Sequence, residues 1–126
     1  AAPTLSAVRI AAWPLSRRAR VLSLAEKVLR ALAALCGDTA LALPRSELLP
    51  VTLVADQLGP GYPHPTPAGM SARAAFARAG YPILDDTYSA KAAAHLFASS
   101  ASETGPVLFW CTKSSAPLPA LDSATS

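Results

Sequence analysis

The sequence predicts an α/β fold in which helices cover part of a parallel sheet. Short apolar segments of strand-forming residues alternate with segments whose apolar residues recur at helical spacing, and this alternation is typical of parallel sheets. The length of 126 residues fits one domain. Alanine accounts for 28 of these residues, and such small side chains let helices pack closely on a sheet.

The N-terminal part contains a predicted strand followed by a long helix. The strand covers residues 7–13 and is closed by Pro14. Ser16 can cap a helix that runs to about Leu35, and Gly37 supplies a left-handed stop. The expected buried face of this helix consists of the apolar residues at helical spacing, which are Val21, Leu24, Ala25, Val28, Leu32 and Leu35.

The next segment is rich in proline and leaves little room for regular structure. Residues 39–43 alternate weakly in polarity and are expected to form a second strand. Val51–Val54 has strand propensity, but the surrounding prolines confine any regular element to a few residues. We therefore expect residues 45–58 to be mostly loop.

A rigid loop and a well-marked helix follow. Residues 59–67 contain four prolines and two glycines, which leave the chain few conformations. Thr66 is the expected helix cap, Pro67 suits the first helical position, and Gly80 ends the helix. The side chains expected to face the core are Met70, Ala74, Phe76 and Ala77, and those expected to face solvent are Arg73 and Arg78.

The C-terminal third is predicted to add two strands and one helix. Ile83-Leu84 forms a brief strand, residues 89–99 form a helix, and residues 107–111 form a strand buried on both faces. The composition then shifts to Ser, Pro and Ala. We therefore expect one α/β domain over residues 1–112, and a closing turn with a frayed tail over residues 113–126.

Charge, hydropathy and cysteine content exclude several classes of protein. Six of the eleven basic residues lie in the first 30 residues, but no aromatic interleaving supports a nucleic-acid partner. No uncharged apolar run approaches the roughly 18 residues of a membrane span. His64 and His95 lack neighbouring ligands, so no metal site is expected. Cys36 and Cys111 are expected to be buried thiols in a reducing compartment, with a disulfide as the alternative. A reducing compartment indicates the cytoplasm, with an organelle as the alternative.

Two tyrosines and two hydroxyl side chains are the candidates for a binding site. Tyr88-Ser89 and Thr112 each follow a predicted strand, and ligands of parallel sheets bind beyond the carboxyl ends of the strands. We expect Tyr62, Tyr88 and Ser89 to surround a flat aromatic cofactor. The alternative interpretation makes Tyr62 a packing anchor, Tyr88 a strand end and Ser89 a helix cap.

Three other reactive side chains are expected to have ordinary structural surroundings. Lys91 lies in the first turn of a predicted helix, where solvation is the usual state. His95 is interpreted as a half-buried helix residue, and Cys111 as a core residue with no role as a nucleophile.

Three segments carry a resemblance to a known family. They are Gly59–Tyr62 with Pro65–Pro67, Ile83–Ala92, and Val107–Thr112 with Ala116–Leu118. In their order and spacing they resemble the loop, the tyrosine segment and the C-terminal ending of D-cysteine desulfhydrases and 1-aminocyclopropane-1-carboxylate deaminases. That family belongs to the pyridoxal-phosphate enzymes of the tryptophan synthase β type. The resemblance implies a fragment of their large domain.

The resemblance also implies roles for four residues. Tyr62 and Tyr88 stand where the family has two active-site tyrosines that contact substrate and cofactor. Ser89 takes the place of the residue that meets the pyridine nitrogen, and Thr112 lies beside the ring. A neutral hydroxyl at the nitrogen leaves the cofactor a weaker electron sink than a carboxylate would. Elimination from a small amino acid, as in a desulfhydrase, is therefore favoured over ring opening.

The resemblance covers only the C-terminal part of the family. The lysine that forms the aldimine and the Gly-rich phosphate loop lie upstream in relatives and have no counterpart here. We therefore expect a chain that is inactive alone and that needs the missing N-terminal part of the same fold, with a homodimer as a further partner. The alternative is a non-catalytic degenerate remnant that acts only by association.

Overall fold

The computed structural model describes residues 3–11, 17–48 and 50–112. Within these residues it contains two strands, three α-helices and two short 3₁₀ helices. These elements are β1 (Leu5–Val8), α1 (Arg18–Cys36), η1 (Thr39–Leu41), η2 (Arg45–Glu47), β2 (Val51–Val54), α2 (Pro67–Arg78) and α3 (Ser89–Ser100).

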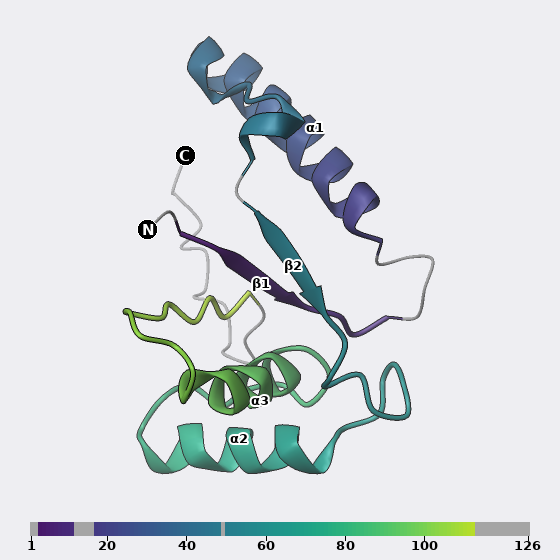
Figure 1. Cartoon of the computed structure of the whole chain (residues 1–126), viewed down its shortest axis with the longest axis vertical. Helices are drawn as coiled ribbons and strands as arrows, with labels where there is room; N and C mark the ends of the chain where they lie inside the picture. The colour runs from purple at the N-terminus through teal and green to yellow at the C-terminus, as the bar shows by residue number, and fades with distance from the viewer. Residues whose placement is uncertain (1–2, 12–16, 49, 113–126) are drawn as a thin grey trace, which may run out of the picture.

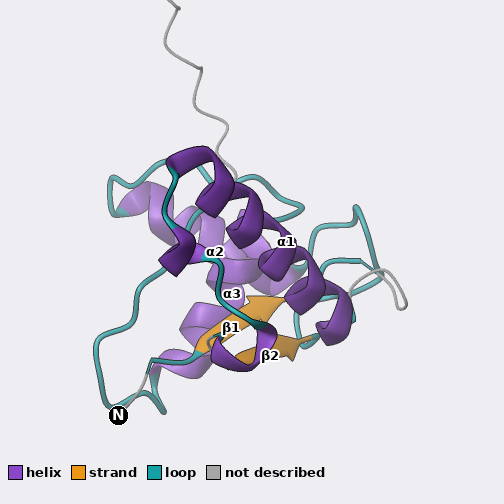
Figure 2. Cartoon of the chain, turned by 90° about the horizontal axis from the view of Figure 1, so that it is seen from above, coloured by secondary structure: helices purple, strands orange, loops and turns teal. Residues whose placement is uncertain are grey.

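The two strands form a small parallel sheet with helices on both sides. Leu5 pairs with Val51 and Val8 pairs with Val54. Helix α1 contacts β2, α3 contacts β1, and α2 packs against α3. Figure 1 shows α1 and α3 on opposite sides of the strands, with α2 beyond α3, and Figure 2 shows the same layers from above. The predicted α/β class with parallel strands and covering helices is therefore confirmed at this coarse level.

Helix α1 ends as the sequence predicts, but its buried face is different. Gly37 follows the helix with a φ of 67°, and its N–H donates to the carbonyl of Ala33. The buried residues of α1 are Leu22 and Ala33, which follow one stripe of the helix. Four of the large residues expected to be buried are exposed, namely Leu24, Val28, Leu32 and Leu35. The sheet has two strands in the described residues and is too narrow to cover them.

Helix α2 has the predicted cap and also a different buried face. The Thr66 hydroxyl accepts a hydrogen bond from the Gly69 N–H at 3.0 Å, and Pro67 occupies the first turn. The buried residues are Gly69 and Ala72, whereas the expected Met70 is exposed. A Cβ added to Gly69 would lie 3.5 Å from the backbone of α3, so the smallest residues form the contact.

The main core lies between α2 and α3 and is built mostly from alanine. Its buried members are Ala72, Leu84, Ala90, Ala93 and Ala94, with Phe76 and Phe109 packed against them. Phe76 is the centre of an aromatic group whose ring centroids lie 5.4 to 5.8 Å from its own, formed with Tyr81, Phe97 and Phe109. Small residues bring the helix axes together, and the aromatic rings close one edge of the interface.

Several predicted elements are wrong. Residues 39–43 do not form a strand, because the Asp38 carboxylate accepts from the Ala40 N–H and starts the turn of η1. The segment expected to be mostly loop contains β2, which exists because β1 supplies a ladder partner. Residues 83–84 and 107–111 form no strand, since within the described residues the sheet ends at β1 and β2.

Three further predictions concern the first strand, the residues outside the described ranges and the two cysteines. Strand β1 begins earlier than predicted and ends at Val8. The closing residues of that strand and the Ser16 cap fall within 12–16, outside the described residues, as do the predicted closing turn and tail at 113–126. Cys36 and Cys111 are thiols, as predicted, but both are exposed, so the expectation that they are buried is wrong.

Candidate functional site

The loop that carries Tyr62 leaves the carboxyl end of β2. Three backbone hydrogen bonds fold it into successive turns, from Leu58 N–H to Ala55, from Gly61 N–H to Leu58 and from His64 N–H to Gly61. Gly59 has a φ of 60°, and a Cβ there would lie 2.6 Å from Thr66 Cγ2. The loop therefore requires glycine at this position for both its backbone conformation and its packing.

The two predicted tyrosines lie together. The hydroxyl oxygens of Tyr62 and Tyr88 are 3.1 Å apart, although the residues are separated by 26 positions in the sequence. Their ring centroids are 6.0 Å apart with an interplanar angle of 61°, which is an edge-on arrangement. Tyr62 remains about half exposed, so the pair is in part accessible from outside.

The hydroxyl of Tyr88 holds its proton more tightly than a free phenol. The hydrogen bond with Tyr62 raises the pKa of Tyr88 above its ordinary value of 10.0. Desolvation and the negative charge of Asp85 act in the same direction. Tyr88 is thus a neutral phenol near pH 7, suited to donate or accept a hydrogen bond and poorly suited to act as a phenolate base.

Asp85 fixes the start of α3, a role that the sequence reasoning missed. Its carboxylate accepts hydrogen bonds from the N–H groups of Thr87, Tyr88 and Ser89 at 3.1, 2.7 and 3.1 Å, and from the Ser89 hydroxyl at 2.6 Å. Burial raises the pKa of Asp85, but these hydrogen bonds outweigh burial and hold it below its ordinary value. The signal was present, since an aspartate just before a helix is a common cap.

Ser89 and Thr112 occupy different surroundings from the tyrosine pair. Ser89 is buried, its hydroxyl donates to Asp85, and the Cys111 thiol donates to it at 3.6 Å. Thr112 is exposed and directly follows Cys111. The strands expected before Ser89 and Thr112 are absent from the described residues, so the argument that placed both residues at one sheet edge is wrong. It is Tyr62 whose loop leaves the carboxyl end of a strand.

Lys91 is buried, and the expectation that it is solvated is wrong. Its side chain has no exposed surface. The ammonium group donates to the carbonyl oxygens of Leu58 and Gly61 at 3.1 and 3.2 Å. These bonds join the first turn of α3 to the loop of Tyr62, and they satisfy a charge that would otherwise be costly to bury.

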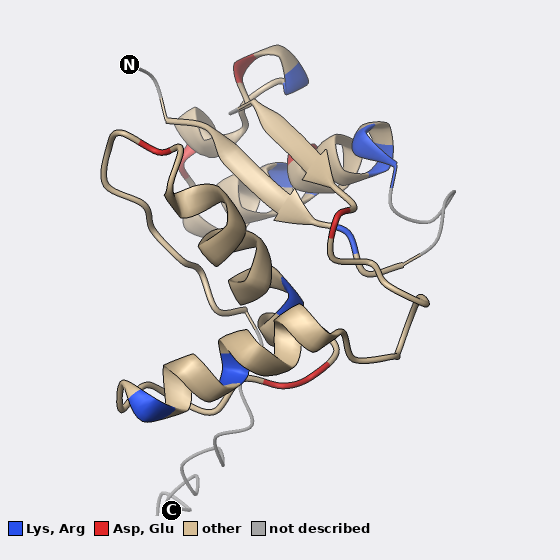
Figure 3. Cartoon of the chain, turned by 60° about the horizontal axis from the view of Figure 1, so that its bottom comes forward, with Lys and Arg blue, Asp and Glu red and all other residues tan. Residues whose placement is uncertain are grey.

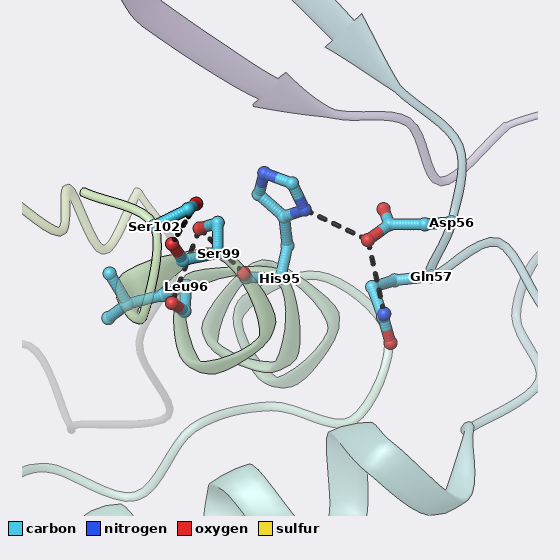
Figure 4. Close-up of polar contacts among 6 residues, drawn as sticks. All are labelled: Asp56, Gln57, His95, Leu96, Ser99 and Ser102. Atoms are coloured by element: carbon cyan, nitrogen blue, oxygen red, sulfur yellow. Dashed lines mark hydrogen bonds and ion pairs between the residues drawn. The ribbon is translucent and has the colours of Figure 1, made fainter.

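His95 contacts a carboxylate that the sequence reasoning did not single out. His95 is half-buried, as predicted, and its Nδ1 lies 2.9 Å from Oδ2 of Asp56, as Figure 4 shows. Burial raises the pKa of Asp56, but the hydrogen bonds from His95 and from Gln57 lower it below its ordinary value. The Ser99 hydroxyl donates to the backbone carbonyl of His95, as Figure 4 shows, so this contact does not involve the imidazole. The pair therefore links α3 to the segment after β2.

A pocket of about 540 Å³ lies beside the α2–α3 core. Its wall is almost entirely apolar, and it does not include the tyrosine pair or Ser89. The lining residues are Ala75, Phe76, Ala79, Tyr81, Pro82, Leu84, Leu96, Phe97, Phe109 and Cys111.

The charged residues form no concentrated site in the described part of the chain. Figure 3 shows Lys and Arg spread over several helices, and most Asp and Glu in the connections between elements. Among the described residues, no group of three His, Cys, Asp or Glu side chains could hold a metal ion. None of the described helices is long and apolar enough to cross a membrane.

The comparisons with known proteins provide no relative for this arrangement. A scan against models of protein families finds no match, and searches of curated proteins and of solved structures find none either.

Proposed function

We propose that this chain is the C-terminal part of a pyridoxal-phosphate-dependent lyase or deaminase, similar to the D-cysteine desulfhydrases, that acts on a small amino acid in the cytoplasm. In this proposal the missing N-terminal part of the same fold supplies the aldimine lysine and the phosphate loop. The assembled protein is a homodimer, and the chain alone is inactive.

The observation that carries this proposal is the contact between Tyr62 and Tyr88. The family resemblance assigns both residues to one active site on sequence motifs alone. Their hydroxyls lie 3.1 Å apart across 26 residues of sequence. Two residues of one site must lie close together, so the contact supports the shared site that the resemblance implies.

The chemistry of the four candidate residues fits such a site unevenly. Tyr62 and Tyr88 fit the substrate side, because their hydroxyls lie together and Tyr62 is about half exposed. Ser89 fits the ring-nitrogen position only if its proton moves away from Asp85, to which it now donates. Thr112 is exposed at the end of the described residues, and its place beside the ring rests on the resemblance.

When bound, pyridoxal phosphate supplies an electron sink for the bond-breaking step. The residues of this chain hold the substrate in position and donate hydrogen bonds to it. Tyr88, whose pKa is raised, donates a hydrogen bond to the substrate, and Tyr62 orients that hydroxyl. Asp85 keeps Ser89 and the first turn of α3 in place through its hydrogen bonds.

The inactivity of the chain alone is supported by its lysines. Of the three lysines, Lys27 lies on α1 across the strands from α3, Lys91 is buried and bonded to two carbonyls, and Lys113 follows the described residues. The Lys91 amine has no access to a carbonyl compound in this arrangement. In this proposal, formation of an aldimine therefore requires a lysine from outside this chain.

A second candidate function is association without catalysis. It is favoured by large apolar side chains on the surface, of which Leu35, Leu108 and Trp110 are about four-fifths exposed. On α1 the exposed residues Leu24, Val28, Leu32 and Leu35 recur at helical spacing, and a contiguous exposed apolar patch marks a surface that another part of the same protein or a partner covers. This candidate shares the fold with the first and differs in requiring no cofactor.

The experiment is to express the entire reading frame that encodes this chain and to assay release of sulfide and keto acid from D-cysteine. We expect a bound-cofactor absorbance band, and a loss in kcat/KM of about 100-fold in Tyr88→Phe. Tyr81→Phe is the matched control, since its ring packs on Phe76 outside the tyrosine pair, and it should retain activity. A product with neither cofactor band nor turnover would leave association as the function.

A further inference from the structure

The most deeply buried charged group of the described residues is the ammonium of Lys91. Lys91 is the largest side chain among the fully buried ones. It lies in the first turn of α3, three residues after Tyr88. A buried ammonium is tolerated only when its N–H groups find acceptors, and here the acceptors come from one loop.

The two acceptors belong to the turn that leads into Tyr62. They are the carbonyl oxygens of Leu58 and Gly61, at 3.1 and 3.2 Å from Nζ. Gly61 immediately precedes Tyr62, and the Gly61 N–H donates to Leu58, so both carbonyls belong to the same turn. A lysine on the helix that follows Tyr88 thus binds the turn that carries Tyr62.

We propose that Lys91 is the positioning residue of the tyrosine pair, holding the Tyr62 loop against α3 so that the two hydroxyls meet. An apolar side chain of similar size would fill the same volume but would not bond the loop carbonyls. The importance of Lys91 for catalysis rests on the proposed function. Its effect on the geometry of the pair does not.

The loop has internal restraints, and these do not replace Lys91. The turn hydrogen bonds among residues 55–64 fix the shape of the loop. They do not fix its distance from α3. The two bonds of Lys91 tie the turn at residues 58–62 to α3, and the Tyr62–Tyr88 bond links the same turn to the residue before α3. Without the ammonium, the tyrosine contact and the Asp56–His95 pair at the start of the loop would have to hold the turn in its place.

The test measures ring contacts by NMR in the 126-residue chain. The nuclear Overhauser effect between the Tyr62 and Tyr88 rings should be lost in Lys91→Ala. The effect between Phe76 and Tyr81, whose centroids are 5.6 Å apart, should persist and serves as an internal control for the α2–α3 core. Lys27→Ala, on α1, is the matched control and should retain both effects.

Chemical rescue separates the ammonium from the volume of the side chain. Lys91→Ala removes the three carbons and the nitrogen that n-propylammonium supplies. We expect n-propylammonium to restore the Tyr62–Tyr88 effect and 1-propanol, of the same size but neutral, not to restore it. Restoration by 1-propanol, or by neither compound, would overturn the proposal.

Two other outcomes would also overturn it. Persistence of the tyrosine contact in Lys91→Ala would show that the ammonium is not needed for positioning. Loss of both ring contacts in Lys91→Ala and in Lys91→Met would make Lys91 a support of the whole α2–α3 unit. Because no substrate or cofactor is used, the result is independent of lyase activity, and an inactive full-length product would count against the proposed function alone.

Discussion

Gly59 is the residue at which local backbone geometry and packing impose the same requirement. Its positive φ is unfavourable for any residue with a Cβ, and the methyl group of Thr66 occupies the space that a Cβ would take. The density of glycine and proline in this loop predicts its rigidity. The contact with Thr66 depends on how the loop returns to α2, and therefore on the three-dimensional structure.

Gly59→Ala should lower the free energy of unfolding by about 1 to 3 kcal/mol, from left-handed strain together with the clash at Thr66. Urea unfolding followed by circular dichroism measures the change. Gly105→Ala is the control, because a Cβ there meets nothing within 4 Å, and it should change stability by less than about 0.5 kcal/mol. Equal effects of the two substitutions would contradict the geometry of the loop.

Asp85 makes a pH-dependent contribution to stability. Its folded-state pKa lies below the ordinary value of 3.8, so the ionised form is favoured by folding. The contribution is present in full well above that value and is lost as the pH falls through the folded pKa. Asp85→Asn keeps one acceptor oxygen and loses the hydrogen bonds that the other oxygen accepts. It should lower the free energy of unfolding by about 1 kcal/mol at pH 7.

The stability difference between the parent chain and Asp85→Asn should therefore shrink as the pH is lowered below about 4. Urea unfolding at a series of pH values gives this difference. Glu103→Gln removes the same charge from an exposed position after α3 and controls for net charge. A difference that stays constant down to about pH 2 would contradict the role of the ionised carboxylate.

At the scale of elements, α1 shows where helical periodicity is informative and where it is not. Its length and its glycine stop follow from the sequence. The predicted apolar stripe is wrong, because the buried residues Leu22 and Ala33 lie outside it and its four large residues after Val21 are exposed. Periodicity identifies residues that favour burial, and it does not show what is available to bury them.

Leu22 and Leu24 provide a matched test of this interpretation, because both lie on α1 and only Leu22 is buried. Leu22→Ala should lower the free energy of unfolding by about 2 to 5 kcal/mol. Leu24→Ala should change it by less than about 0.5 kcal/mol. Thermal unfolding of both variants measures the contrast. Similar losses would mean that the outer face of α1 is packed in solution, and sedimentation velocity would then reveal self-association.

At the scale of the whole molecule, the sheet is small for a parallel one. Parallel sheets are usually covered on both faces and contain several strands, whereas this sheet has two strands in the described residues. The residues expected to form a further buried strand, 107–111, are irregular and mostly exposed. A larger sheet completed by another part of the same fold would account for both features.

Because the lysine that forms the aldimine is expected to lie outside this chain, pyridoxal phosphate added to the 126-residue protein should form no stoichiometric adduct. Borohydride reduction followed by mass spectrometry of peptides provides the measurement. Lys91 should remain unmodified because its amine is buried and bonded to carbonyls. Stoichiometric reduction onto a single lysine would contradict this expectation, and reduction onto Lys91 would also contradict the buried geometry.

The sequence alone determined the features that depend on short-range chemistry. The Gly37 stop, the Thr66 cap with Pro67, and the extent of α3 are set by residues within one or two turns. The coarse α/β class also followed, because it depends on the alternation of segments along the whole chain. Tyr62 and Tyr88 were chosen first from the rigid turns that hold them and then from the motif resemblance, and the structure brings the two residues together.

Which segments find partners depends on contacts between distant parts of the chain. Val51–Val54 becomes a strand because β1 lies beside it and pairs with it. Residues 107–111 form no strand because none of the described strands pairs with them. The burial of Lys91 and its bonds to the Tyr62 loop depend on contacts between residues about 30 positions apart. Strand pairing and burial are long-range properties, so residue type and periodicity restrict them without fixing them.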